Sequence, residues 1–251
     1  MSSLAIGFVV LGCLCAGSLL GFLIRRALPQ HHLSADSKDA VKIGTGLIGT
    51  MGALVLGLMV GSAKGSYDAQ KAELTQMSAK IILLDRGLAH FGPETKELRE
   101  QLKLATRHMV DLFWPEENLP SSRVSAAPTG YETIFDSILN LTPKNDSQKS
   151  IKGQITALAI DIGQTRWLLN QQSGSSISVV FLVLLIFWLS LIFLSTGLLA
   201  PVNGTVVATL MLCAVSLAGA VFLILELDRP FTGMIQIPSE TLRRAMEQLG
   251  R

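Results

Sequence analysis

The sequence is poor in charge and in cysteine, and both shortages narrow the classes of protein to which it can belong. Only 16% of the residues are charged and 49% are apolar, which excludes an ordinary soluble domain. The net charge of +2 offers no basic surface for nucleic acid. Cys13, Cys15 and Cys213 all lie in apolar runs, so they form no disulfide framework and no CxxC motif. We expect them to be small packing residues.

Catalytic and cofactor-binding motifs are also missing. We find no HExxH, GxSxG, Walker or dinucleotide-binding glycine motif, and no pair of carboxylates deep in an apolar run. His90 and His108 have no Cys or acidic partner at metal-ligand spacing. His31 and His32 are adjacent and are expected in a solvated loop, with pH sensing or metal capture as the alternative. We therefore predict no enzyme, no cofactor and no metal site.

What the chain does contain is four apolar runs long enough to cross a bilayer, since a spanning helix needs about 20 residues. They cover residues 4–24, 43–63, 177–200 and 205–227. The first is expected to be an uncleaved anchor, because its amino-terminal side lacks Lys and Arg, while Arg25 and Arg26 follow it. The predicted fold is all-α, with transmembrane hairpins over 1–63 and 176–228, a soluble helical insert over 64–175, and a short tail over 229–251.

The second run carries a stripe of small residues at steps of three or four, which share one helical face and continue into two charges. The stripe consists of Gly46, Thr50, Ala53, Gly57, Gly61, Lys64 and Asp68. One interpretation is that it lines a pore, with Thr50 and a ring of Lys64 facing the ions, and with Asp68 weakening the field of Lys64. The other is that it packs closely against another membrane helix.

No helix breaker follows this run, so we predict one helix that leaves the membrane and ends at Gly92–Pro93. Its apolar residues follow a heptad from Tyr67 to Phe91. Further helices are expected at about 93–114, 130–141 and 147–173, with a linker over 115–130. The apolar residues of each helix form a narrow seam along one face. These seams predict an antiparallel bundle, and they can be buried within one chain or between chains. Asp85 and Arg86 are expected to be solvated, with a paired contact as the alternative.

Other local patterns concern the remaining spans. Cys13, Gly17 and Gly21 recur every four residues, which is typical of close helix contact. Small packing positions are also expected in the fourth span, at Ala208, Cys213, Ser216, Gly219 and Ala220. A charge cluster at the membrane boundary follows that span, and it consists of Glu226, Asp228 and Arg229.

Lys and Arg residues near the spans favour two opposite membrane orientations. Arg25 and Arg26 favour a cytoplasmic connector after the first span, whereas the connector after the third span has no Lys or Arg. The opposite side carries Lys and Arg next to the spans, at Lys64, Lys71, Arg166, Arg229, Arg243, Arg244 and Arg251. We predict that both termini and the insert are cytoplasmic.

The run GTGLIGTMGALVLGLMVGSAKGSYDAQKAELTQMSAKIILLDRGLAHFG, with ELDRPFTGMIQI after the fourth span, resembles a bacterial membrane-protein family of unknown function that is sometimes labelled bestrophin-like. The resemblance covers nearly the whole chain. It implies a multi-pass protein of the bacterial inner (cell) membrane, in contact with the lipid bilayer, that forms a homo-oligomer, a pentamer by analogy with bestrophins. It also implies a channel for inorganic ions, anions above cations, with the second span around the pore. The sequence differs from bestrophins in lacking a bulky aromatic cluster in that span and a matching acidic calcium clasp. The alternative function is a non-transporting scaffold or sensor that uses the helical insert for partner or oligomer contacts.

Overall fold

The computed structural model describes residues 2–29, 34–114, 130–172 and 177–250. Every regular element in these ranges is a helix, which confirms the all-α prediction. The elements are α1 (Ser3–Ala27), α2 (Ala35–Phe91), the 3-10 helix η2 (Pro93–Thr95), α3 (Lys96–Phe113), α4 (Gly130–Asn140), α5 (Asp146–Gln172), α6 (Val179–Leu199), α7 (Gly204–Leu227) and α8 (Glu240–Gln248). Most of the predicted linker over 115–130 lies outside the described residues.

The chain divides into two compact units, which are described separately. The membrane unit comprises residues 1–67, 175–229 and 233–235. It holds α1, the first part of α2, α6 and α7, and these four helices have the length and apolar composition to span a bilayer. The chain is therefore a polytopic membrane protein with four candidate spans, as the hydropathy pattern predicts.

Helices α1 and α6 approach each other through glycine. A Cβ atom added at Gly17 would lie 2.9 Å from the carbonyl oxygen of Ser190. At Gly21 it would overlap the carbonyl oxygen of Leu194, and at Gly197 that of Ser18. The backbones therefore meet where no side chain intervenes, which confirms the close contact predicted for this face of the first span.

The small residues expected to pack the fourth span do not do so within this chain. Ala208, Cys213, Ser216 and Gly219 are exposed on α7. The buried small residues of α7 are instead Ala214 and Ala218, one turn apart on another face. Small residues occur on more than one face of this helix, and composition does not say which face meets α1. Packing of the exposed positions against another chain stays a prediction.

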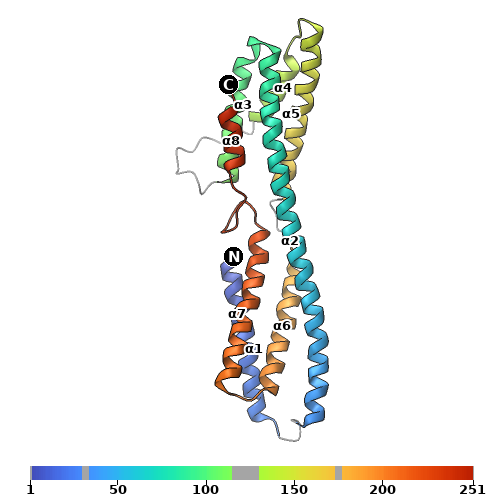
Figure 1. Ribbon diagram of the computed structural model, residues 1–251, viewed down its shortest axis with the longest axis vertical. Helices are drawn as coiled ribbons and strands as arrows, with labels where there is room; N and C mark the ends of the chain where they lie inside the picture. The colour runs from blue at the N-terminus through green and yellow to red at the C-terminus, as the bar shows by residue number, and fades with distance from the viewer. Residues whose placement is uncertain (1, 30–33, 115–129, 173–176, 251) are drawn as a thin grey trace. The chain divides into compact units, whose positions relative to one another are not determined.

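Helix α2 runs without interruption for 57 residues, from the membrane unit into the insert, as shown in Figure 1. It ends at Phe91 because Gly92 has a φ of 145°, a conformation that L side chains rarely adopt, and Pro93 then begins η2. Its start is capped by the Ser34 hydroxyl, which accepts the backbone N–H of Ser37 at 3.3 Å. The predicted continuous helix and its stop are confirmed.

The insert unit comprises residues 68–174, 230–232 and 236–251. Here the heptad seam of α2 is buried within the chain itself, at Leu74, Met77, Ile81, Leu84, Leu88 and Phe91. Helix α5 packs closely on it, since a Cβ at Gly87 would lie 2.5 Å from Cγ2 of Ile155. The apolar seam of α2 is therefore covered by the same chain and needs no second chain to bury it.

The segment after the fourth span is part of the insert core rather than a free tail. The indole N–H of Trp114 donates to the carbonyl oxygen of Ile237 at 2.8 Å. Phe231 stacks on Phe113 with ring centroids 4.9 Å apart and meets Trp114 edge-on at 5.7 Å. Helix α8 then packs on α3 and buries Leu242 and Ala245.

Candidate functional site

Most of the predicted stripe on α2 faces away from the other described helices of the membrane unit, whereas Gly46 also lines a groove between α2 and α6. All of its residues from Gly46 to Lys64 are exposed, and so is Asp68, which belongs to the insert unit. A Cβ added at Gly46, Gly57 or Gly61 would meet nothing within 4 Å among the described residues. The Thr50 hydroxyl donates to the carbonyl oxygen of Gly46 at 2.9 Å and stays available as an acceptor on the surface. We call residues 46, 50, 53, 57, 61 and 64 the open stripe.

The face of α2 turned toward its neighbours carries other residues. Gly52, Met59, Ala63 and Tyr67 are buried. In the most apolar 18-residue stretch of α2, only 11% of the residues are buried. The corresponding fractions are 28%, 28% and 22% for α1, α6 and α7. Large side chains beside the open stripe are exposed as well, including Leu47, Leu54 and Leu58. Within this chain, α2 is therefore the span with the most surface left for lipid, water or other chains.

A charge lies at the end of the open stripe. The ammonium group of Lys64 sits 5.3 Å from the centroid of the Tyr67 ring, one turn further along α2. A cation over an aromatic face at this distance is held by the ring quadrupole. Lys64 is nevertheless exposed at the end of the stripe.

The predicted boundary charges at the end of α7 are largely buried. Glu226 and Asp228 are 4% and 5% exposed. One carboxylate oxygen of Glu226 accepts the backbone N–H of Met234 at 2.6 Å. This bond holds a turn whose Gly233 has a φ of 100°. Glu226 therefore organises the chain just after the fourth span, and its acceptor bond is structural rather than catalytic.

A third buried carboxylate, which the sequence did not single out as buried, lies in the insert unit. Asp85 is 1% exposed and accepts two bonds of 2.8 Å from the guanidinium of Arg99 on α3. It also accepts the backbone N–H of Gly250 at 3.3 Å. These bonds raise the pKa of Arg99, although its partial burial acts in the opposite direction.

The prediction of a solvated Asp85 is thus wrong. The burial of Asp85 was indicated by its position in the sequence. Asp85 lies four residues after Ile81 and three before Leu88, on the side of the apolar seam. Arg99 flanks the next seam, directly after Leu98. Opposite charges beside the seams of consecutive antiparallel helices indicate a bridge between them.

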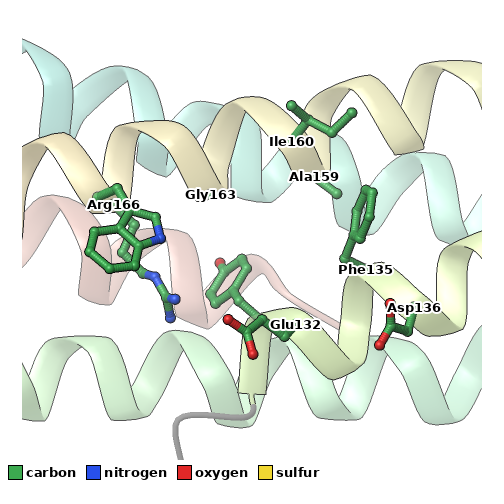
Figure 2. A pocket seen from close by; sticks show the side chains of 9 residues that line it. Glu132, Phe135, Asp136, Ala159, Ile160, Gly163 and Arg166 are labelled. Carbon is green, nitrogen blue, oxygen red and sulfur yellow. The ribbon is translucent and has the colours of Figure 1, made fainter.

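An open groove of about 420 Å³ lies between α4 and α5 of the insert unit. Figure 2 shows Glu132, Phe135 and Asp136 on α4 beside Ala159, Ile160 and Arg166 on α5. The Arg166 guanidinium lies 5.3 Å from the centroid of the Tyr131 ring. Burial raises the pKa of the Tyr131 hydroxyl well above its usual range, while Thr106 and the charge of Arg166 lower it in part. Burial thus favours the neutral form of this phenol.

In the described ranges, no three His, Cys, Asp or Glu side chains are grouped so as to hold a metal ion. Lys80 pairs with Asp161 at 2.7 Å, which uses both charges in a bridge between α2 and α5. Three features remain of functional interest. They are the open stripe of α2, the groove between α4 and α5, and a groove between α2 and α6 that is described below.

Two comparisons with known proteins agree with this architecture. Residues 12–242 match the family model described as Bestrophin-like domain. A crystal structure of a bacterial bestrophin homologue from Klebsiella pneumoniae, carrying one point mutation, superposes with a TM-score of 0.71 at 14% sequence identity. The alignment covers 96% of both chains. None of the curated proteins compared with the chain matches it. The structural likeness extends over the membrane spans and the helical insert alike.

Proposed function

We propose that this chain, which belongs to the bestrophin-like family, is a homo-oligomeric ion channel whose pore is lined by α2. The observation that carries the proposal is the open stripe, which is exposed at every position from Gly46 to Lys64 and meets no other described helix from Thr50 onward. Copies of α2 arranged around an axis would turn these small residues toward a common path. The resemblance to bestrophins implies five copies.

The stripe leaves room for an aqueous path. Gly46, Gly57 and Gly61 have no side chain and open space beside them, so copies of α2 around an axis would keep space between them. The Thr50 hydroxyl adds an acceptor near the middle of the span. The large apolar residues flanking the stripe, such as Leu47 and Leu54, are suited to contacts with neighbouring copies or lipid.

We further propose that the channel favours anions over cations, because a ring of Lys64 at the end of the stripe would raise the local anion concentration. This protein would lie in the bacterial inner membrane, with its termini and insert in the cytoplasm. No chemical step is assigned to it, and the proposed activity is passive conduction.

Ion flux through liposomes tests the proposal. Purified full-length protein in vesicles loaded with KCl should release chloride faster than empty vesicles do. In planar bilayers under a KCl gradient, the reversal potential should lie toward that of chloride. Absence of flux from protein that remains monodisperse and helical, in several salts and at several pH values, would contradict channel function.

The role of Lys64 has a matched control on another helix. Lys64→Gln should lower the chloride-to-potassium permeability ratio severalfold, since it removes one positive charge per subunit from the end of the stripe. Lys103→Gln removes an exposed lysine of α3 and should leave the ratio unchanged. Equal effects of the two substitutions would argue against a pore mouth at Lys64.

Water access separates a pore from a helix contact. In a background without Cys13, Cys15 and Cys213, a Thr50→Cys variant should react with a membrane-impermeant methanethiosulfonate reagent and lose conductance. A Met51→Cys variant, which is exposed in the chain but lies about 100° around the helix from Thr50, should not. No reaction at position 50 in functional protein would place the stripe against another helix.

A scaffold or sensor is the second candidate, and the unbroken α2 favours it. A helix of 57 residues that belongs to both units can carry a shift or rotation across the membrane boundary. This candidate predicts no flux and a stable partner protein crosslinked to the insert in native membranes. Flux without such a partner would contradict it.

A further inference from the structure

A groove of about 510 Å³ opens between α2 and α6, at the end of the membrane unit where the apolar run of α2 begins. The two helices lie next to each other in Figure 1. The wall on the α2 side consists of Lys42, Thr45, Gly46 and Gly49, so the groove shares Gly46 with the first turn of the open stripe. The wall on the α6 side includes Ile192, Ser195 and Leu199. None of these residues belongs to the charge cluster at the end of α7.

The interior of the groove is effectively apolar. The Thr45 hydroxyl lies 2.8 Å from the carbonyl oxygen of Val41 and 2.9 Å from the Ser195 hydroxyl. Thr196 donates to the carbonyl oxygen of Ile192 at 2.8 Å. These hydroxyls are therefore satisfied within the chain, and an occupant need not supply hydrogen bonds. The nearest heavy atom to a Cβ at Gly49 is Cδ1 of Ile192, at 3.8 Å, so the floor is shaped by glycine and isoleucine.

The open end of the groove is cationic. Lys42 directly precedes Ile43, the first residue of the apolar run, and its side chain is 66% exposed. Its bond of 3.0 Å to Asp39 is an exposed ion pair, which contributes little and exchanges readily. On the other side, Arg25 donates to the carbonyl oxygen of Leu199 at 3.0 Å. Two cations thus flank the mouth at the level where lipid headgroups lie.

We propose that this groove binds a phospholipid with an anionic headgroup. One acyl chain lies between α2 and α6 over Gly49, and the phosphate group meets Lys42 and Arg25. A second copy of the chain is a poorer occupant, because a parallel copy brings the same lysine and arginine to the same depth of the membrane. A zwitterionic lipid satisfies the apolar walls but gives the two cations less net attraction.

Native mass spectrometry of the full-length delipidated protein tests the selectivity. Titration with palmitoyl-oleoyl phosphatidylglycerol should give higher occupancy than titration with the matching phosphatidylcholine. Lys42→Gln should weaken phosphatidylglycerol binding by about fivefold, the effect of one interfacial charge. Lys71→Gln, on the same helix and outside the groove, should leave it unchanged.

The apolar half of the site has its own pair of variants. Gly49→Leu fills the groove and should reduce retention of both lipids, whereas Gly44→Leu adds the same side chain where nothing lies within 4 Å. A photoreactive side chain at Leu199 should crosslink to lipid in native membranes. Equal affinity for the two lipids, unchanged retention in Gly49→Leu, or a crosslink to a second copy of the chain would each overturn the proposal.

Discussion

Buried carboxylates stand out at the scale of single residues. Asp85 and Glu226 are both almost wholly enclosed, and each accepts at least one backbone N–H in addition to any ionic partner. A buried charge is tolerated only where its lone pairs are satisfied. Both carboxylates hold segments near the carboxyl end of the chain, Gly250 in the insert unit and Met234 in the membrane unit.

We expect Asp85→Ala to lower the free energy of unfolding of the insert unit by about 3 kcal/mol, because Arg99 would keep a partly buried charge without its carboxylate. Thermal unfolding in detergent, followed by circular dichroism, measures the loss. Asp39→Ala makes the same change at an exposed pair and should cost less than about 0.5 kcal/mol. A loss for Asp85→Ala no larger than for Asp39→Ala would contradict this account.

The pH dependence of the same pair follows from the pKa of Arg99, which the bonds to Asp85 raise. A basic group whose folded-state pKa is raised contributes stability that is complete below its unfolded-state pKa and disappears only as pH rises through the folded-state value. For an arginine that window lies above pH 12. The Arg99 side of the pair should therefore add no pH dependence to the unfolding temperature between about pH 6 and 9.

Gly233→Ala should destabilise the turn after α7 by about 1 to 3 kcal/mol. The φ of 100° is unfavourable for alanine, and the added Cβ would lie 2.5 Å from a carboxylate oxygen of Glu226. Gly219→Ala is the matched control, since this helical glycine has open space beside it and alanine favours helix. The unfolding temperature in detergent should fall for the first variant and stay level or rise for the second.

At the scale of elements, α2 combines two patterns on one helix. The heptad from Leu74 to Phe91 buries its seam against α3 and α5, while the glycine-rich first part leaves one face uncovered. Helices α1 and α6 show the opposite use of glycine, since Gly17, Gly21 and Gly197 let their backbones meet. The same residue type therefore serves close contact in one place and an open surface in another.

The crossing of α1 and α6 should tolerate no added side chain. Gly21→Ala and Gly197→Ala place a Cβ against the carbonyl oxygens of Leu194 and Ser18, which belong to rigid helix backbone. We expect each to cost about 1 to 3 kcal/mol, as overpacking does. Gly12→Ala lies on α1 with nothing within 4 Å and serves as the control. Unchanged unfolding temperatures for both crossing variants would mean that these helices do not meet as closely as described.

At the scale of the whole molecule, four candidate spans place the two ends of the chain on one side of the membrane. The lysines and arginines beside the spans favour the cytoplasm for that side, against the pair Arg25 and Arg26. Green fluorescent protein fused to the carboxyl terminus should fluoresce, and alkaline phosphatase fused there should be inactive. The reverse pattern would move the termini and the insert outside the cytoplasm, and with them the proposed mouth at Lys64.

Prediction from sequence worked where a pattern depends on one element alone. Apolar length located the four spans, and the Gly92–Pro93 stop located the end of α2, because hydropathy and backbone preference act locally. It failed for Asp85, because the surroundings of this residue depend on which face meets which neighbour. The groove between α2 and α6 went unseen for the same reason, since Thr45 and Ser195 are 150 residues apart.

By itself, the sequence determined an all-helical membrane protein with four spans, one continuous helix from membrane to insert, and a stripe of small residues along it. Only the tertiary structure decided that most of the stripe, from Thr50 to Lys64, is left uncovered, that Arg99 neutralises Asp85, and that the segment around Phe231 belongs to the insert core. Helical period assigns residues to a face, but the packing of side chains from distant segments determines which faces are covered.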